Sequence, residues 1–413
     1  MDSHSDTAFL FPRPSGIRNR ALLLWLAVSP MASAIEIQID YTYDTNHFFS
    51  AAERRTALEA ATSFFEQVLS DTLLEINPAN FPGSSWTVEV QNPQTGNTIY
   101  LPNYVVPADT IIIFVGSREL GGNVRGLAGS SGWSASGNSS WFARIQGRGN
   151  PGAVYSSASA ATDYAPHVGF ISFDSSTSFN FSTTQSLSGV DFIPIALHEI
   201  GHVLGIGISD SWRNLISGSS FTGPASIRAA GGPPSVQSGG GHFDQSVADE
   251  PGFGSFERPH GASTPVLMRP SATPNGSLLN VATDLDLAAL SDIGWEVTPP
   301  LSLALTLLGP GSIQITWPSS SFRNYVIEKS PDLDFSSGIQ VNLDGDGSLS
   351  SWTDPSATGE RAFYQLRDFA YGTSAASFAP ASIAATSTGA TDPIMTRSIV
   401  PRWVEGCGCE EHQ

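Results

Sequence analysis

The spacing of apolar residues predicts a mixed α+β fold for the N-terminal part of the chain. Alternating apolar and polar residues predict a strand at Ile35–Tyr41, and apolar residues at helical spacing predict a helix at Ser50–Asp71. At the start of that helix, Ser50 followed by Glu53 predicts a capping box. Further apolar runs predict strands at Thr110–Val115 and Val168–Phe173 and helices at Ile193–Leu204 and Thr283–Gly294.

Segments rich in Gly, Ser and Pro separate these elements. Residues 121–152 are predicted to form a long surface loop, and residues 206–280 hold little periodic signal. After a linker at 295–300, short strands separated by turn residues predict a small all-β sandwich over residues 301–371. Residues 372–413 begin with an Ala/Ser/Thr-rich stretch and are predicted to be a low-complexity, disordered tail.

Residues 1–34 have the pattern of a secretory signal peptide. Three arginines precede an apolar run at 21–28, and Ala32-Ser33-Ala34 forms a small-x-small cleavage site. The apolar run is too short to span a bilayer, and no second run of spanning length follows. We therefore expect a protein without a membrane span that is exported, extracellular or periplasmic, and that begins at Ile35 after cleavage.

Composition narrows the function classes. A chain of 413 residues with 40% hydrophobic and 14% charged residues is expected to form at least two folded domains. The net charge of −19 leaves no basic excess, which argues against nucleic-acid partners. Both cysteines, Cys407 and Cys409, lie near the C-terminus, so the predicted core contains no disulfide. We expect a monomer.

The predicted helix at Ile193–Leu204 carries the sequence His198-Glu199-Ile-Gly-His202. Residues at i and i+4 share one helix face, so both imidazoles can bind one Zn²⁺ ion, while Glu199 can reach a metal-bound water. The competing interpretation is an ordinary helix with two surface histidines. Apolar residues elsewhere on the helix, a Gly three residues after His202 and a downstream Met in a Pro-flanked turn argue against it.

These residues resemble the motif of the metzincin metallopeptidases, a His-Glu-x-x-His-x-x-Gly sequence that ends here at Gly205 and is followed by a Met, here Met268. The resemblance implies a metzincin-like catalytic domain, a catalytic base at Glu199, a structural turn at Gly205, and Met268 as the Met-turn beneath the zinc. It also implies a protein or peptide substrate. The usual motif places a third His or Asp three residues after the Gly, but that position is Ile208.

A long insertion before the third ligand is typical of leishmanolysin-like members of this clan. The Gly/Pro-rich run that ends at Gly241-His242-Phe243 resembles that insertion, and residues 283–295 resemble the closing helix of bacterial leishmanolysin-like proteins. The resemblance covers residues 35–297.

Several residues can supply the third zinc ligand. His242 is favoured because three glycines precede it and allow the backbone to approach the metal closely. His260, eight residues before Met268, is the alternative, and a carboxylate at Glu250 or Glu257 is a further one.

The C-terminal strands resemble fibronectin-III or immunoglobulin-like modules, notably at Ile313–Trp317 and Phe363–Leu366. Asp344-Gly-Asp346-Gly suggests a Ca²⁺ loop, but it lacks the downstream bidentate Glu, so a hairpin turn is favoured.

The sequence thus predicts a secreted zinc-dependent endopeptidase in which Glu199 is the general base. The alternative is a non-catalytic binding or adhesion protein on the same scaffold. Retention of Glu199 beside both histidines favours the enzyme, because a scaffold has no need of a base.

Overall fold

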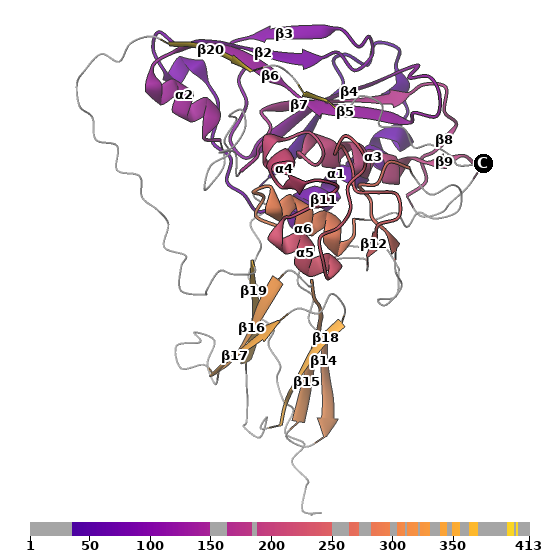
Figure 1. The fold of residues 1–413 in the computed structure, drawn as a ribbon, viewed down its shortest axis with the longest axis vertical. Helices are drawn as coiled ribbons and strands as arrows, with labels where there is room; N and C mark the ends of the chain where they lie inside the picture. The colour runs from indigo at the N-terminus through magenta and orange to yellow at the C-terminus, as the bar shows by residue number, and fades with distance from the viewer. Residues whose placement is uncertain are drawn as a thin grey trace, which may run out of the picture.

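The computed structural model describes residues 35–148, 163–183, 188–249, 264–271, 282–297, 304–309, 312–320, 323–330, 339–344, 349–355, 363–370, 395–399 and 402–403. Over these residues the chain is a mixed α+β protein with several separate sheets, in agreement with the predicted fold class (Figure 1).

A five-stranded mixed sheet of order β1-β4-β7-β5-β21 organises the N-terminal part. Its strands are β1 (Glu36–Asp40), β4 (Thr110–Arg118), β5 (Gly126–Ser130), β7 (Val168–Asp174) and β21 (Arg402–Trp403). β1, β4 and β7 run parallel, whereas β5 is antiparallel to β7. The strands predicted from the sequence therefore form, each within a few residues of its expected bounds.

The two faces of this sheet are covered by different layers. Ile111, Ile113 and Val115 of β4 point into a core shared with α1 (Ala52–Val68) and α3 (Phe192–Val203). Ile112 and Phe114 point the other way, into a core shared with a four-stranded antiparallel sheet of order β20-β6-β2-β3 (Figure 1). That sheet contains β2 (Ser85–Gln91), β3 (Thr98–Pro102), β6 (Gly132–Gly137) and β20 (Met395–Ile399).

The loop predicted at residues 121–152 is wrong over most of its described length. β5, β6 and the helix α2 (Ser139–Gln146) form there, and Trp133 and Trp141 are fully buried. Glycine is required in β5 for packing, because a Cβ at Gly126 would collide with the Glu199 carboxylate. Glycines that let a strand approach a helix closely therefore resemble a loop when only the sequence is considered.

The start of α1 also differs from the prediction. Its N-cap is Ala51, which makes no side-chain cap hydrogen bond, and Ser50 ends a short 3-10 helix, η1 (Phe48–Ser50). The Asp44 carboxylate accepts the backbone N–H groups of Phe48 and Phe49 instead. The chain turn before α1 is thus stabilised by a residue outside the predicted capping box.

Three shorter helices lie close to α3 (Figure 1). They are α4 (Asp210–Asn214), α5 (Pro224–Ala230) and α6 (Asp284–Asp292), of which α5 and α6 pack together and lie below α3 in Figure 1. Thr283 caps α6 in a capping box with Asp286, and Asp292 accepts the first backbone N–H groups of α5. The remaining short elements are η2 (Pro78–Asn80), β8 (Phe179–Asn180), β9 (Val190–Asp191), β10 (Ile216–Ser217), β11 (Ser220–Phe221), β12 (Ala248–Asp249) and β13 (Thr264–Pro265).

The first part of the expected linker is buried. Trp295 donates its indole N–H to the Leu204 carbonyl oxygen at 2.7 Å, and Val297 forms an antiparallel bridge with Leu69 at the end of α1. These two residues therefore close the same core that begins at β1, and they do not act as a linker.

The C-terminal strands form two three-stranded antiparallel sheets that share one buried cluster around Ile315, Trp317 and Tyr325. One sheet contains β14 (Ala304–Gly309), β15 (Ser312–Pro318) and β18 (Leu349–Asp354), and the other β16 (Arg323–Ser330), β17 (Ile339–Asp344) and β19 (Phe363–Ala370). β17 and β18, the strands on either side of the suggested Ca²⁺ loop, lie in different sheets and therefore do not pair as a hairpin. Asp346, the second carboxylate of the suggested Ca²⁺ loop, lies outside the described residues.

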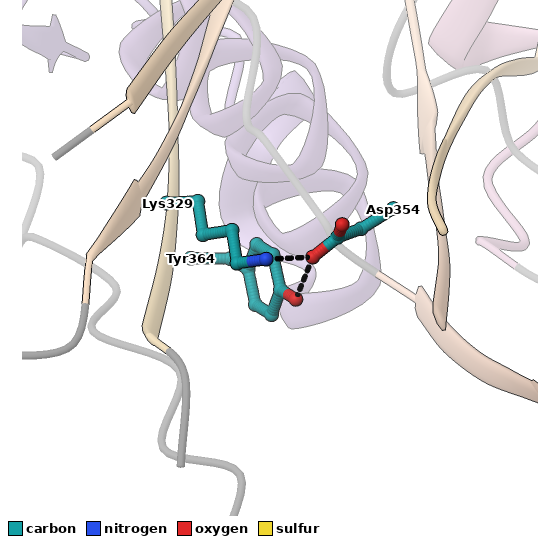
Figure 2. A network of polar contacts seen from close by, with 3 residues as sticks. All are labelled: Lys329, Asp354 and Tyr364. Atoms are coloured by element: carbon teal, nitrogen blue, oxygen red, sulfur yellow. Dashed lines mark hydrogen bonds and ion pairs between the residues drawn. The ribbon is translucent and has the colours of Figure 1, made fainter. Parts of the chain in front are cut away.

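A polar contact connects these two sheets (Figure 2). The Lys329 ammonium of β16 lies 2.6 Å from Asp354 Oδ2 of β18, and the Tyr364 hydroxyl donates to the same oxygen at 2.6 Å. Burial raises the pKa of the Tyr364 hydroxyl, which therefore stays a donor at neutral pH.

Two short stretches of the predicted disordered tail form strands. β20 pairs with β6 over Met395–Ile399, and β21 pairs with β5 over Arg402–Trp403. Local composition does not reveal them, because their pairing depends on sheet edges supplied by distant parts of the chain. Among the described residues, no helix combines the length and apolar character needed to cross a membrane.

Asp71 gives the fold a pH dependence that can be measured. Its carboxylate accepts the Glu296 backbone N–H at 2.9 Å, and burial, together with the charges of Glu296 and Asp163, raises its pKa from 3.8 to about 7. A folded pKa above the unfolded one gives stability that is complete below about pH 4 and is lost as the pH rises through 7.

We therefore expect Asp71→Asn, which keeps an acceptor for the Glu296 N–H, to raise the free energy of unfolding more at pH 8 than at pH 5. One pKa unit corresponds to about 1.4 kcal/mol, so the two units between pH 5 and the folded pKa of about 7 should give a difference of about 2–3 kcal/mol in the free energy of unfolding from urea titrations. An effect of equal size at both pH values would contradict this assignment.

Candidate metal centre

The helix α3 brings its two histidines to one face and then stops abruptly. His198 and His202 lie one turn apart, and every residue of the helix is buried. Gly205 follows with a φ of +108°, and a Cβ there would lie 2.5 Å from the Tyr164 ring. Only glycine fits this turn, as expected for the structural role predicted at this position.

His242 joins these two histidines from a separate segment of the chain. The Nε2 atom of His202 lies 3.1 Å from that of His198 and 3.1 Å from that of His242. The three side chains are buried, and their nearest ring nitrogens all lie within 4.8 Å of one another. Zinc–nitrogen bonds of about 2.0–2.1 Å in tetrahedral geometry separate two ligand nitrogens by about 3.3 Å, so the three rings are spaced suitably for one Zn²⁺ ion.

The outer nitrogen of each ring fixes its orientation. Nδ1 of His198 lies 2.8 Å from the Leu267 carbonyl oxygen, and Nδ1 of His202 lies 2.8 Å from that of Ile206. These oxygens only accept, so each Nδ1 donates and each Nε2 keeps its lone pair toward the other rings.

Burial also keeps the rings neutral. It lowers the pKa of His198 to about 4 and that of His202 to about 3, and it lowers the pKa of His242 well below its usual value. Three neutral imidazoles with lone pairs directed at a common point repel one another unless a cation lies between them. This donor set suits Zn²⁺.

The segment before His242 folds back in the way that its glycines allow. Gly239 and Gly240 have φ values of +94° and +71°, and Nδ1 of His242 lies 3.0 Å from Gln237 Oε1. Ile208, the third position of the usual motif, is fully buried and offers no ligand atom. The other third-ligand candidates, His260, Glu250 and Glu257, lie outside the described residues.

Met268 occupies a buried turn against α3. A Cβ at Gly201, between the two histidines of the helix, would lie 2.5 Å from the Met268 sulfur. The Phe243 N–H donates to the Met268 carbonyl oxygen at 2.9 Å, which ties this turn to the segment that carries His242. Met268 thus packs directly against the helix that carries His198 and His202.

Asp286 holds this turn in place, a role that the sequence pattern does not reveal. Its carboxylate accepts the backbone N–H groups of Leu267 at 2.8 Å and Met268 at 3.0 Å, and it also accepts the N–H and hydroxyl of Thr283. Because the Leu267 carbonyl oxygen orients His198, Asp286 is connected to the metal centre through one peptide unit. In the sequence it resembles any acidic residue in the first turn of a helix.

Glu199 lies on the same helix with no exposed surface, and neither carboxylate oxygen has a hydrogen-bond partner among the described residues. Burial raises its pKa well above its usual value. A buried carboxylate without a partner is costly, so its presence calls for a functional reason. The side chain packs against Gly126 of β5.

Comparison with known proteins supports the same chemistry. The sequence model of the matrixin peptidase family, Peptidase_M10, matches residues 152–220, a stretch that contains His198, Glu199 and His202 and ends before His242. No curated protein and no solved structure gives a significant match. The match and the three-histidine cluster together support a zinc-dependent peptidase of metzincin type.

We expect Asp286→Asn to weaken zinc binding about 10–100-fold, the usual cost of losing an outer-shell partner of a metal ligand. An amide replaces one of the two acceptor oxygens by a donor, although four donors point at the carboxylate. Zinc affinity is measured by competition with a chelator. Asp292→Asn is the matched control. Asp292 lies at the other end of α6, the helix that also carries Asp286, and it caps α5. Equal zinc affinities in the two variants would refute the positioning role.

Proposed function

We propose that the protein is a secreted zinc-dependent endopeptidase of the leishmanolysin-like branch of the metzincins. One observation carries the proposal: three buried imidazoles converge through their Nε2 atoms, and the residue next to His198 is a buried carboxylate that has no hydrogen-bond partner among the described residues. The zinc ligands in this proposal are His198, His202 and His242.

Bound zinc supplies a polarised, readily deprotonated water and a Lewis acid for the scissile carbonyl group. Glu199 acts as the general base, with a carboxylate oxygen that takes up the proton of the attacking water and later delivers it to the leaving amine nitrogen. Its isolation from other hydrogen-bond donors favours this role, because nothing in the described chain competes for its oxygens.

A non-catalytic binding protein on the same scaffold is the competing function. The buried Glu199 argues against it, because an unsatisfied carboxylate destabilises the fold and gives no advantage to a scaffold. The two functions are separated by measuring zinc content by native mass spectrometry and hydrolysis of a denatured protein by the same sample. A protein that binds stoichiometric zinc but cleaves no denatured substrate would favour the binding function.

The leishmanolysin-like assignment is supported by the place of the third histidine. Ile208 replaces the ligand of the usual motif, and His242 follows α4, α5 and a glycine-rich turn. The two C-terminal sheets are proposed to be a fibronectin-III-like or immunoglobulin-like sandwich, because one buried cluster lies between them.

Export is proposed from the pattern of residues 1–34. We expect the signal peptide to be cleaved after Ala34, because a small residue at positions −1 and −3 is what the processing site requires. N-terminal sequencing of the exported protein should then begin at Ile35. An exported protein that still begins at Met1 would exclude this processing.

A further inference from the structure

The strand β5 borders the candidate metal centre. It packs on α3, and its first residue, Gly126, lies directly against the Glu199 side chain. One edge of β5 pairs with β7, whereas the other edge faces away from the parallel strands. An extended peptide that paired with this outer edge would run alongside the helix that carries Glu199.

The outer edge of β5 is covered, at Gly129 and Ser130, by the chain's own C-terminal segment. In β21, Arg402 pairs with Ser130 and Trp403 pairs with Gly129, in antiparallel orientation. Just before it, β20 pairs antiparallel with β6 from Met395 to Ile399. Both strands are the outermost strands of their sheets, although they are far in sequence from the strands they accompany, and Figure 1 shows β20 beside β6 and β2.

The direction of β21 is informative. Because β21 is antiparallel to β5, the chain passes Ser130 first and Gly129 next, and it therefore advances toward Gly126 and Glu199. An exposed sheet edge binds an extended peptide through main-chain hydrogen bonds with little demand on its sequence. A protein substrate in extended form therefore fits the edge that β21 covers.

We propose that the two C-terminal strands β20 and β21 act as an intramolecular, substrate-like segment that occupies the β5 edge and restrains the peptidase. The proposal rests on the proposed function and adds its regulation: the β5 edge is the docking surface, and an extended polypeptide is its ligand. Five paired residues on β6 hold the segment in place, whereas only two pair with β5. The contact with β5 is therefore the weaker one and can be displaced by a competing peptide.

The degree of inhibition depends on the effective concentration of the segment, which is tethered to the same chain. A segment held on the same chain has an effective concentration of about 1 mM. Where this effective concentration is about ten times the dissociation constant of the untethered strand, the edge is covered about ten times as often as it is free. Release of the segment should then raise kcat/KM about tenfold, mainly through KM.

The test uses the full-length protein with Arg402→Pro and Trp403→Pro combined, since proline removes the backbone N–H that a ladder needs. The matched control carries two prolines at Ala384 and Ala385, in the sequence before β20. Three quantities are measured: hydrogen exchange of the Gly126–Ser130 amides, kcat/KM on a denatured protein, and inhibition by a synthetic peptide of residues 394–404. We expect faster exchange and about tenfold higher kcat/KM only in the first variant, and competitive inhibition of it by the peptide.

Two results would overturn the proposal. Unchanged amide exchange in β5 would mean that β21 does not cover this edge. Faster exchange without a rise in kcat/KM, or without competition by the peptide, would show that β21 covers the edge of β5 but does not regulate the site. If no zinc-loaded variant cleaves any substrate, the proposed function fails instead, and exchange together with peptide binding still decides whether the segment docks on β5.

Discussion

Glu199→Gln is expected to lower kcat about 10²–10⁴-fold while the protein keeps its zinc, because a general base contributes about that much to rate. Glutamine has nearly the same shape and also fits against Gly126, but it cannot take up a proton. Glu199 makes no hydrogen bond among the described residues, so the substitution breaks no structural contact there. Zinc is counted by native mass spectrometry, and kcat is measured on a denatured protein.

The control for this variant is Glu53→Gln, an exposed glutamate in the first turn of α1. It removes the same charge without touching the site and should leave kcat unchanged. The uncharged glutamine at position 199 should also raise the free energy of unfolding of the metal-free protein, because a buried carboxylate is lost. Full activity in Glu199→Gln would remove this residue from the mechanism.

His242→Ala is expected to abolish stoichiometric zinc binding. Two histidines of α3 remain, but a catalytic site needs three protein ligands. The affinity should fall by more than the about 100-fold that loss of an outer-shell partner costs, because a direct ligand is removed. Peptide hydrolysis should disappear together with the metal, whereas Glu199→Gln separates the two.

Two further histidine variants make the His242 experiment decisive. His260→Ala tests the alternative ligand, and His167→Ala controls for loss of a buried histidine outside the site, where Nε2 contacts the Ile145 carbonyl oxygen. We expect both to retain zinc. Loss of zinc in His260→Ala alone would transfer the third ligand position to His260. Circular dichroism of each variant separates loss of a ligand from loss of the fold.

Local sequence predicted the parts of the site that depend on neighbouring residues. His198, Glu199 and His202 share one helix, so their common orientation follows from its period. The glycine turn at Gly205 was predictable for the same reason, since the chain must leave the helix there. Strand β7 was visible as an apolar run because both of its faces are buried.

Features that depend on contacts between distant segments could not be predicted in this way. The glycines of β5 resemble a loop until the neighbouring carboxylate of Glu199 shows why a side chain is excluded. Asp286 resembles an ordinary capping residue, because its bonds to Leu267 and Met268 join segments that no local rule connects. Sequence alone favours His242 over His260 without deciding between them, since the fold of the intervening insertion determines which ring reaches α3.

The separation of His202 and His242 along the chain means that a bound metal ion would also affect the stability of the fold. These two proposed ligands are 40 residues apart in sequence, so an ion bound to both would close a loop as a covalent cross-link does. Such a cross-link is worth about 4 kcal/mol of chain entropy in the loop-closure model. Metal supply should thus govern the lifetime of the protein as well as its activity: molecules that lose the ion become easier to unfold and to digest, and an inactive pool does not accumulate.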